Sequence, residues 1–275
     1  MTIRTIKQKS PEEREEKALD EGVAEGEIIY RSVRQDGITT LQEKTAALAW
    51  SGVAAGISMG FSMVAEGLLE AHLPHAAWTP LIAKLGYAVG FLIVILGRQE
   101  LFTEQTLSAV LPLLSRNDAE HATLANVTRV WSVILVANIV GAAAFAAFTA
   151  WSGAFSTETA QAFSMIGHAD LSHGFYTTMV RGIYAGFLIA TMIWLLPAAG
   201  SARFFVIVLL AYIVGLGAFS HIIAGSAPGL YVVFRGERPF IDWFGGFLIP
   251  TFIGNSVGGV ALVAALAHVQ HAPED

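Results

Sequence analysis

The sequence contains no cysteine, so it has neither disulfide bonds nor thiolate groups for catalysis or metal binding. Charged residues make up only 14% of the chain, and nearly half of them lie before Ala46. No lysine follows Lys84, and no basic patch of the kind that binds nucleic acid is present. We therefore expect neither a nucleic-acid partner nor a cofactor. The net charge of −6 excludes little, because the charges are so unevenly placed.

Apolar residues account for 54% of the chain and the mean hydropathy is +0.58, as is typical of integral membrane proteins. The length suits one bundle of six spans, and the first apolar run begins only near Ala46, so no secretory signal is expected. Ser10, Pro11 and Glu13 form a capping box that predicts a helix start. The predicted organisation is a cytosolic helical segment at 1–44, a pore domain at 45–268 and a tail at 269–275.

Two apolar segments, 92–112 and 210–230, are interrupted by polar residues. An unbroken membrane helix needs about 20 apolar residues. Backbone freed at membrane depth is tolerated only where it is buried in protein or lines a cavity. Both segments are therefore predicted to be broken helices. The six expected spans are 46–69, 78–114 (broken), 130–151, 174–196, 203–234 (broken) and 240–268.

Short motifs recur in the two halves of the chain and indicate an internal duplication. The repeated pairs are Asn138–Gly141 with Asn255–Gly258, Phe102–Glu104 with Phe219–His221, and Gly52–Gly56 with Gly182–Gly186. Paired interrupted segments in two halves are the best sequence pointer to a transport site. We predict an inverted repeat of three spans plus three, with Glu104 opposite His221 in register.

Lysine and arginine in the short loops predict the orientation in the membrane. The N-terminal segment, Arg116, Arg129 and Arg203 fall on one side, whereas the loops at 72–75 and 152–173 carry no lysine or arginine. Arg235 and Arg238 are exceptions to the pattern. We expect a multi-pass protein of the bacterial inner membrane with both termini in the cytoplasm.

With six spans, breaks after Glu100-Leu-Phe-Thr103 and at Phe219-Ser-His221, and Gly254-Asn255 in span six, the chain resembles the formate/nitrite transporter family over about residues 30–265. The run from Arg98 to Glu104 is more similar to a divergent YfdC-like branch of that family. The resemblance implies an aquaporin-like fold and a homo-pentamer with one pore per protomer. It also implies conduction of small monovalent anions such as formate, nitrite or hydrosulfide, often with a proton.

The chain departs from the family pattern at several positions. The best-known members carry a lysine in the outer loop before span four, where this chain has His168, Asp170 and His173. Gly186 stands where many members have asparagine. Glu104 follows the loop threonine, where small or amide residues are commoner. A substrate is therefore harder to infer from the resemblance than the fold.

A bare anion at the bilayer centre costs many kcal/mol. Helix N-termini at the two breaks would lower this cost, and so would a proton that neutralises the anion. His221 matches the family's central pore histidine, and the ordinary pKa of a histidine side chain lies close to cellular pH. Thr103 and Ser220 are expected to bond the solute or orient the imidazole. The alternative is a neutral, buried His221 that only holds the break in shape. A pore-facing Glu104 would oppose anions and favour protonated acids or neutral solutes.

Charges at membrane depth are rarely unpaired, so we expect at least one ion pair among Arg98, Glu100, Glu104 and Arg181. Bonds between helices are expected from Asn138 and Asn255 in the same network. The candidates for apolar constrictions beside the histidine are Leu101, Phe102, Tyr87, Phe91 and Val214.

Other functions fit the sequence less well. His268 and His271 lack a third ligand for a metal site. An intramembrane serine hydrolase using Ser226 or Ser256 lacks an acidic partner, so we expect no enzyme. A pore for water, glycerol or ammonia and a non-transporting sensor or scaffold remain as alternatives to an anion channel.

Overall fold

The computed structural model describes residues 11–114 and 122–271, so Ser10 and Arg116 lie outside the described residues. The described part consists of helices joined by turns and loops and contains no strand. In chain order its elements are α1 (Pro11–Gln42), α2 (Thr45–His72), α3 (Thr79–Ala83), η1 (Lys84–Tyr87), α4 (Ala88–Leu96), α5 (Phe102–Ser108), η2 (Leu111–Leu114), α6 (Leu124–Trp151), α7 (Thr157–Asp170), α8 (Phe175–Leu195), η4 (Gly200–Ala202), α9 (Arg203–Leu216), α10 (Ser226–Phe234), the π-helical η5 (Asp242–Leu248) and α11 (Ile249–His271).

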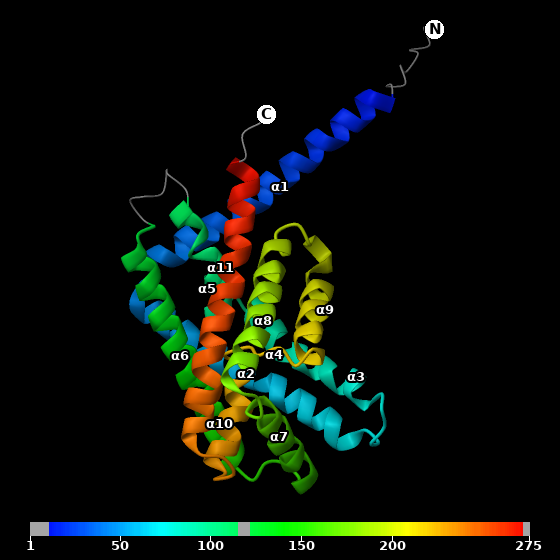
Figure 1. Cartoon of the computed structure of the whole chain (residues 1–275), viewed down its shortest axis with the longest axis vertical. Helices are drawn as coiled ribbons and strands as arrows, with labels where there is room; N and C mark the ends of the chain where they lie inside the picture. Colours follow the sequence, from blue (N-terminus) through cyan, green and yellow to red (C-terminus); the bar gives the residue numbers. More distant parts are fainter. Residues whose placement is uncertain (1–10, 115–121, 272–275) are drawn as a thin grey trace.

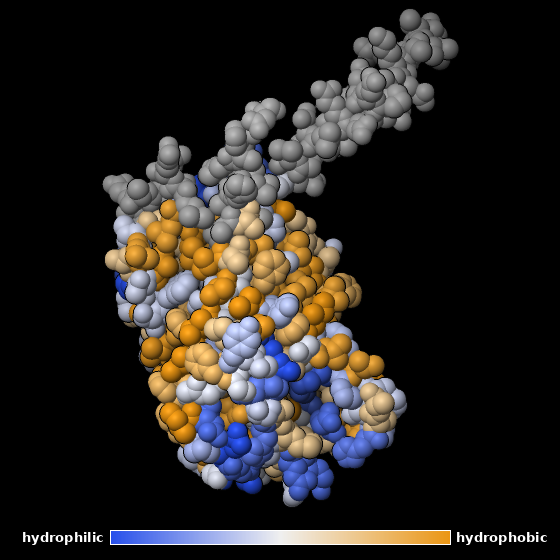
Figure 2. Space-filling model, in the orientation of Figure 1, coloured by the Kyte–Doolittle hydropathy of each residue, from blue (hydrophilic) through white to orange (hydrophobic). Residues whose placement is uncertain are grey.

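Long apolar helices form a bundle, and α1 extends away from one end of it (Figure 1). In the described part of the chain, five segments are long and apolar enough to cross a membrane, whereas the apolar segment Gly200–Leu216 is shorter. The five are Thr45–His72, Thr79–Leu96, Leu124–Trp151, Phe175–Leu195 and Asp242–Leu262. Figure 2 shows hydrophobic residues over the sides of the bundle and hydrophilic residues gathered at the end near α7. A bilayer around the apolar sides accounts for this surface.

In two helix pairs of the bundle the backbones approach each other closely at glycines. In α2, a Cβ on Gly56 would collide with the carbonyl oxygen of Asn138 on α6. In the second half, a Cβ on Gly186 of α8 would collide with the carbonyl oxygen of Asn255 on α11. Only glycine permits backbones to approach so closely, as in other membrane helix pairs.

The segment between α6 and α8 differs from the expected loop, because it contains the helix α7. The Ser156 side chain accepts a hydrogen bond from the backbone N–H of Thr159 at 3.2 Å and caps the helix. Ala162 and Phe163 on the inner face of α7 are buried. This helix brings Asp170, at its C-terminal end, against the bundle.

Candidate functional site

The two broken helices end in the same way. Helix α4 stops at Leu96 and α9 at Leu216, each followed by a glycine and then a residue in the left-handed region. These residues are Arg98, with φ of 50°, and Ala218, with φ of 49°. The next N–H group turns back in both breaks, from Gln99 to the Val94 carbonyl and from Phe219 to the Val214 carbonyl, both at 3.0 Å. Both breaks are therefore defined turns with the same backbone geometry.

One asparagine holds each break to the neighbouring helices. The Oδ1 atom of Asn138 accepts the N–H of Phe102 at 2.9 Å, and its Nδ2 donates to the carbonyls of Gly52 and Glu100 at 2.8 and 2.9 Å. The prediction that this side chain bonds across helices is correct.

Asn255 repeats the arrangement in the second half. Its Oδ1 accepts the N–H of Ile222 at 2.9 Å, and its Nδ2 donates to the carbonyls of Gly182 and Ser220 at 2.9 and 2.8 Å. The Ser220 carbonyl is thus used in the frame of the break, as the Glu100 carbonyl is in the first half.

These bonds correct the predicted register of the duplication. Glu100 corresponds to Ser220 and Phe102 to Ile222, so Leu101, and not Glu104, is the counterpart of His221. Phe102 and Asn138 are 36 positions apart, whereas Ile222 and Asn255 are 33 apart. The second half is three residues shorter in this stretch, and an alignment without a gap is shifted by that amount.

The His221 imidazole lies between the two breaks. Its Nε2 is 2.8 Å from Thr103 Oγ1, and its Nδ1 accepts the backbone N–H of Ala224 at 3.1 Å. An Nδ1 that accepts this bond carries no proton, so the neutral ring donates from Nε2 to Thr103. The ring also meets the edge of Phe91, with centroids 5.0 Å apart. His221 and Thr103, predicted from distant motifs, are brought into direct contact.

Two cavities approach this contact from opposite ends of the bundle. The α1-side cavity, of about 370 Å³, is lined by α1 and by the first break, and Glu104 faces it. The α7-side cavity, of about 90 Å³, is lined by α7, α8 and the second break, and includes His221 and Ser220. Phe91, Leu101 and Thr103 line neither cavity and have no exposed surface, so they lie in the closed region between them.

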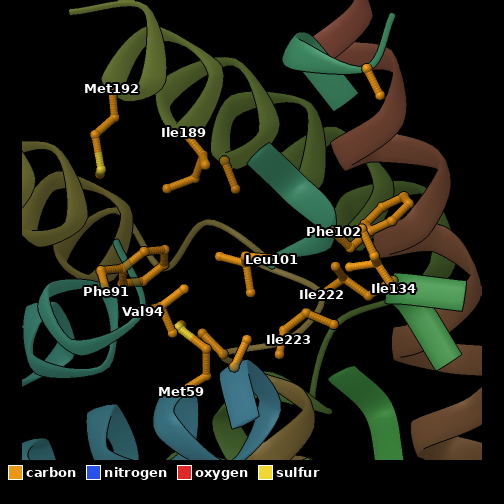
Figure 3. Close-up of a cluster of buried hydrophobic side chains, with 14 of the residues drawn as sticks. Met59, Phe91, Val94, Leu101, Phe102, Ile134, Ile189, Met192, Ile222 and Ile223 are labelled. Carbon is orange, nitrogen blue, oxygen red and sulfur yellow. The ribbon is translucent and has the colours of Figure 1, made fainter. Parts of the chain in front are cut away.

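The five constriction candidates have different surroundings. Leu101 projects toward Phe91 and Val94, whereas Phe102 projects the other way, toward Ile134 (Figure 3). Phe102 packs against Trp131 and Phe252, with ring centroids 5.5 Å away in each case. Phe102 therefore packs between α6 and α11, and its place in a constriction stays a prediction. Tyr87 and Val214 line the α7-side cavity.

The ion pair expected among Arg98, Glu100, Glu104 and Arg181 is absent, although the structure describes all four residues. Glu100 accepts from the Gln105 amide at 2.7 Å, and Arg181 donates to His173 Nε2 at 2.6 Å. One carboxylate oxygen of Glu104 is buried without a hydrogen-bond partner. Neutral partners took the place of the expected opposite charges.

A buried salt bridge that sequence reasoning did not predict lies in the wall of the α7-side cavity. Lys84 on η1 donates to the Glu66 carboxylate on α2 at 2.5 Å, and the Glu66 side chain is only 6% exposed. The signal available in the sequence was an isolated acid within an apolar span. Within the described residues, no group of three His, Asp or Glu side chains could hold a metal ion.

The profile of the formate/nitrite transporter family matches residues 27–269. The chain is 39% identical over 242 residues to the inner membrane protein YfdC of Escherichia coli K12, covering 88% of this chain and 77% of that protein. It is 28% identical over 249 residues to the formate channel BtFdhC of Bacillus thuringiensis, covering 86% and 92% of the two chains.

Solved structures show the same fold. A pentameric formate channel with formate bound superimposes with a TM-score of 0.69 at 20% identity, covering 86% of this chain and 98% of the other. An ion channel of the same family gives a TM-score of 0.76 at 17% identity, covering 89% and 99%. The predicted all-helical membrane architecture is confirmed by these matches.

Proposed function

The chain belongs to the formate/nitrite transporter family, and we propose that it conducts small monovalent anions together with a proton through the contact between His221 and Thr103. The single observation that carries the proposal is this contact: a neutral imidazole bonded to a hydroxyl in the closed region between two cavities. Family membership supports transport and argues against an enzyme. The proton linkage and the roles of individual residues are our inference from the geometry.

The Thr103 hydroxyl is suited to receive an oxyanion. It accepts the Nε2–H of His221, so its own hydrogen is available to donate, and within the described residues it has no second partner. The dipoles of the helices that begin after the two breaks favour negative charge at these positions. An anion that reaches this point is stabilised by the hydroxyl and by these dipoles.

Proton transfer at His221 involves a local rearrangement. A ring protonated on both nitrogens has no lone pair for the Ala224 N–H, so that hydrogen bond must open when the ring takes up a proton. Return of the proton restores the bond. During this cycle the proton on His221 offsets the negative charge of the passing anion. This lowers the free-energy cost of placing an isolated ion in the membrane.

We assign the constrictions of the pore from the same geometry. Leu101 and Phe91 are fully buried, and Phe91 packs against the His221 ring. They form the apolar barrier in our proposal, and Tyr87 and Val214 shape the α7-side approach to it. Asn138 and Asn255 hold the two breaks in place. Arg98, Glu100 and Arg181 act in the surrounding networks and do not touch the solute.

We further propose a homo-pentamer in the bacterial inner membrane, with both termini and the α1-side cavity facing the cytoplasm. Support comes from the lysine and arginine residues of the N-terminal segment and from Arg129 and Arg203, which lie beside α1 at one end of the bundle. A solved channel of the same fold is pentameric by its description. Residues 1–44 would form the cytoplasmic segment, 45–268 the pore domain and 269–275 the tail.

The proposal is tested by formate and nitrite flux into proteoliposomes at about pH 5 and about pH 7.5, for the native chain and for His221→Asn. We expect flux in the native chain that is greater at low pH, and a changed pH profile in the variant. An intact native protein that passes neither ion would refute the proposal.

A second candidate function is a pore for neutral solutes or protonated acids. The observation that favours it is Glu104, whose carboxylate faces the α1-side cavity with one oxygen lacking a donor. A negative charge at that position opposes anions. Glycerol or ammonia flux that is insensitive to membrane potential, with no formate flux, would favour this second function.

A further inference from the structure

The α7-side cavity carries charged groups that the proposed function does not use. Apart from His221, two cations, two carboxylates and one histidine line it. They are Lys84, Arg181, Glu66, Asp170 and His173. In a cavity of only about 90 Å³, the balance of these charges decides which solutes can enter.

Asp170 lies next to the pore histidine's own turn. A Cβ on Gly225 would be 3.3 Å from Asp170 Oδ2. Gly225 is the residue before α10, and its N–H bonds the carbonyl of His221 at 2.9 Å. The Asp170 carboxyl therefore sits where the α7-side cavity leads to the His221 turn.

The cations in the cavity already have hydrogen-bond partners. Lys84 is neutralised by its salt bridge to Glu66. Arg181 donates to His173, whose pKa is lowered by burial and by the adjacent guanidinium, so that histidine is uncharged near neutral pH. With two cations against Glu66 alone, the cavity has one net positive charge when Asp170 is protonated and none when Asp170 is ionised.

We propose that Asp170 is a specificity-determining residue of the pore, because a small monovalent oxyanion binds in the α7-side cavity only together with a proton on the Asp170 carboxyl. An ionised Asp170 cancels the positive charge that would hold the anion and repels it directly. A protonated Asp170 removes the repulsion and offers an O–H donor. The inference rests on the proposed function and adds a second proton site to it, at the entrance instead of at His221.

The surroundings of Asp170 support titration in the useful range. Burial, the largest influence, raises its pKa to about 7; Lys84 and Arg181 act in the opposite direction, and Glu66 adds to the rise. The titratable and charged groups around it are Glu66 and Glu70 on α2, Lys84 and Tyr87 on η1, His173 in the following loop, Arg181 on α8 and His221 in the second break. Asp170 differs from Glu66, the other carboxyl that lines the cavity, in having no hydrogen-bonded cation among the described residues.

The test measures formate binding by calorimetry on the full chain in detergent, at about pH 6 and about pH 8.5, for the native protein, Asp170→Asn and the control Glu158→Gln. Glu158 is an exposed carboxylate at the other end of α7. The native protein and the control should bind about tenfold or more weakly at the higher pH, whereas Asp170→Asn should bind equally at both. Equal pH dependence in all three proteins overturns the inference.

A measurement on the native chain alone keeps the inference testable if Asp170→Asn does not assemble. In weakly buffered solution at about pH 7.5, formate binding should take up close to one proton per protomer. Binding without proton uptake overturns the inference. Binding is measured without flux, so the two failures are distinguishable. Absent flux with proton-linked binding refutes only the proposed function, whereas flux with pH-independent binding refutes only the role of Asp170.

Discussion

Asn138 and Asn255 occupy equivalent positions, and each uses its whole amide to join a helix break to the helix that precedes it in the same half. Each accepts one backbone N–H and donates to two carbonyls, so two backbone groups of the break and one carbonyl of the neighbouring helix bond to one side chain. The arrangement explains how non-helical backbone is maintained inside an apolar bundle, where no water can replace the lost partners.

Replacing either asparagine should therefore destabilise the protein strongly. Asn138→Leu or Asn255→Leu leaves two buried backbone groups of the break unpaired, one N–H and one carbonyl, each at a cost of about 1–3 kcal/mol. Thermal unfolding in detergent should show both variants well below the native midpoint. Thr191→Ala serves as the control, because its hydroxyl bonds only the Phe187 carbonyl of its own helix. Near-native midpoints for both asparagine variants would contradict this reading of the breaks.

Thr103→Val keeps the shape of the side chain and removes the partner of His221. The donated Nε2–H bond is lost, together with the hydroxyl that we assign to the oxyanion. Formate flux should fall by about 10²-fold if this donor acts on the solute. The matched control is Thr149→Val, whose hydroxyl bonds the Phe145 carbonyl within α6. Equal flux in the two variants would argue against a direct role of Thr103.

Leu101→Ala should widen the closed region and relax size selection. Leu101 has no exposed surface and lies beside Phe91 and Val94 (Figure 3). The truncation costs about 2–5 kcal/mol of stability, but should admit anions larger than formate, such as acetate or lactate. Phe102→Leu is the comparison, since its ring packs toward Trp131. It should lower stability without changing the selectivity, and identical selectivity changes in both would place the barrier elsewhere.

Gly56→Ala and Gly186→Ala should both impair assembly of the bundle. The added Cβ would collide with the backbone of the paired helix in each case, and backbone cannot move aside as a side chain can. Overpacking of this kind typically costs about 1–3 kcal/mol or more. Gly246→Ala is the control, because nothing lies within 4 Å of its Cβ position. Folded yields from membranes, measured by size exclusion in detergent, should separate the first two variants from the third.

Stability should also depend on pH through Asp170. Its pKa is raised from the ordinary 3.8 to about 7 by burial, so between these values the folded protein holds a proton that the unfolded chain has released. Stability must therefore fall as the pH rises through this window. We expect the thermal midpoint of the native protein to decline between about pH 5 and about pH 7.5 more than that of Asp170→Asn. Parallel curves would show that other groups dominate.

The positions of the breaks could be predicted from the sequence because each apolar run is long enough for a membrane helix but is interrupted by glycine and polar residues. The duplication could be predicted because the motifs Gly52–Gly56 and Asn138–Gly141 recur as Gly182–Gly186 and Asn255–Gly258. The family resemblance was found from these residues, and the match over residues 27–269 confirms it.

Other features depended on distances that the sequence does not contain. The register of the duplication requires the hydrogen bonds of both breaks, because three residues are missing from the second half. The orientation of the Phe102 side chain depends on contacts around the first break, where the Phe102 N–H bonds Asn138, and the sequence does not show these contacts. The charged wall of the α7-side cavity joins α2, η1, α7 and α8, and α7 itself carries too few large apolar residues to stand out from a loop.

The equivalence of Leu101 and His221 has a consequence for the direction of current. The two breaks share one geometry but carry an aliphatic residue at one of the two matching positions and an imidazole at the other, between cavities of about 370 Å³ and about 90 Å³. A solute arriving from one face meets the hydrocarbon barrier first, and from the opposite face the titratable ring first. The same frame therefore predisposes the pore to rectify, with unequal flux in the two directions under equal and opposite gradients.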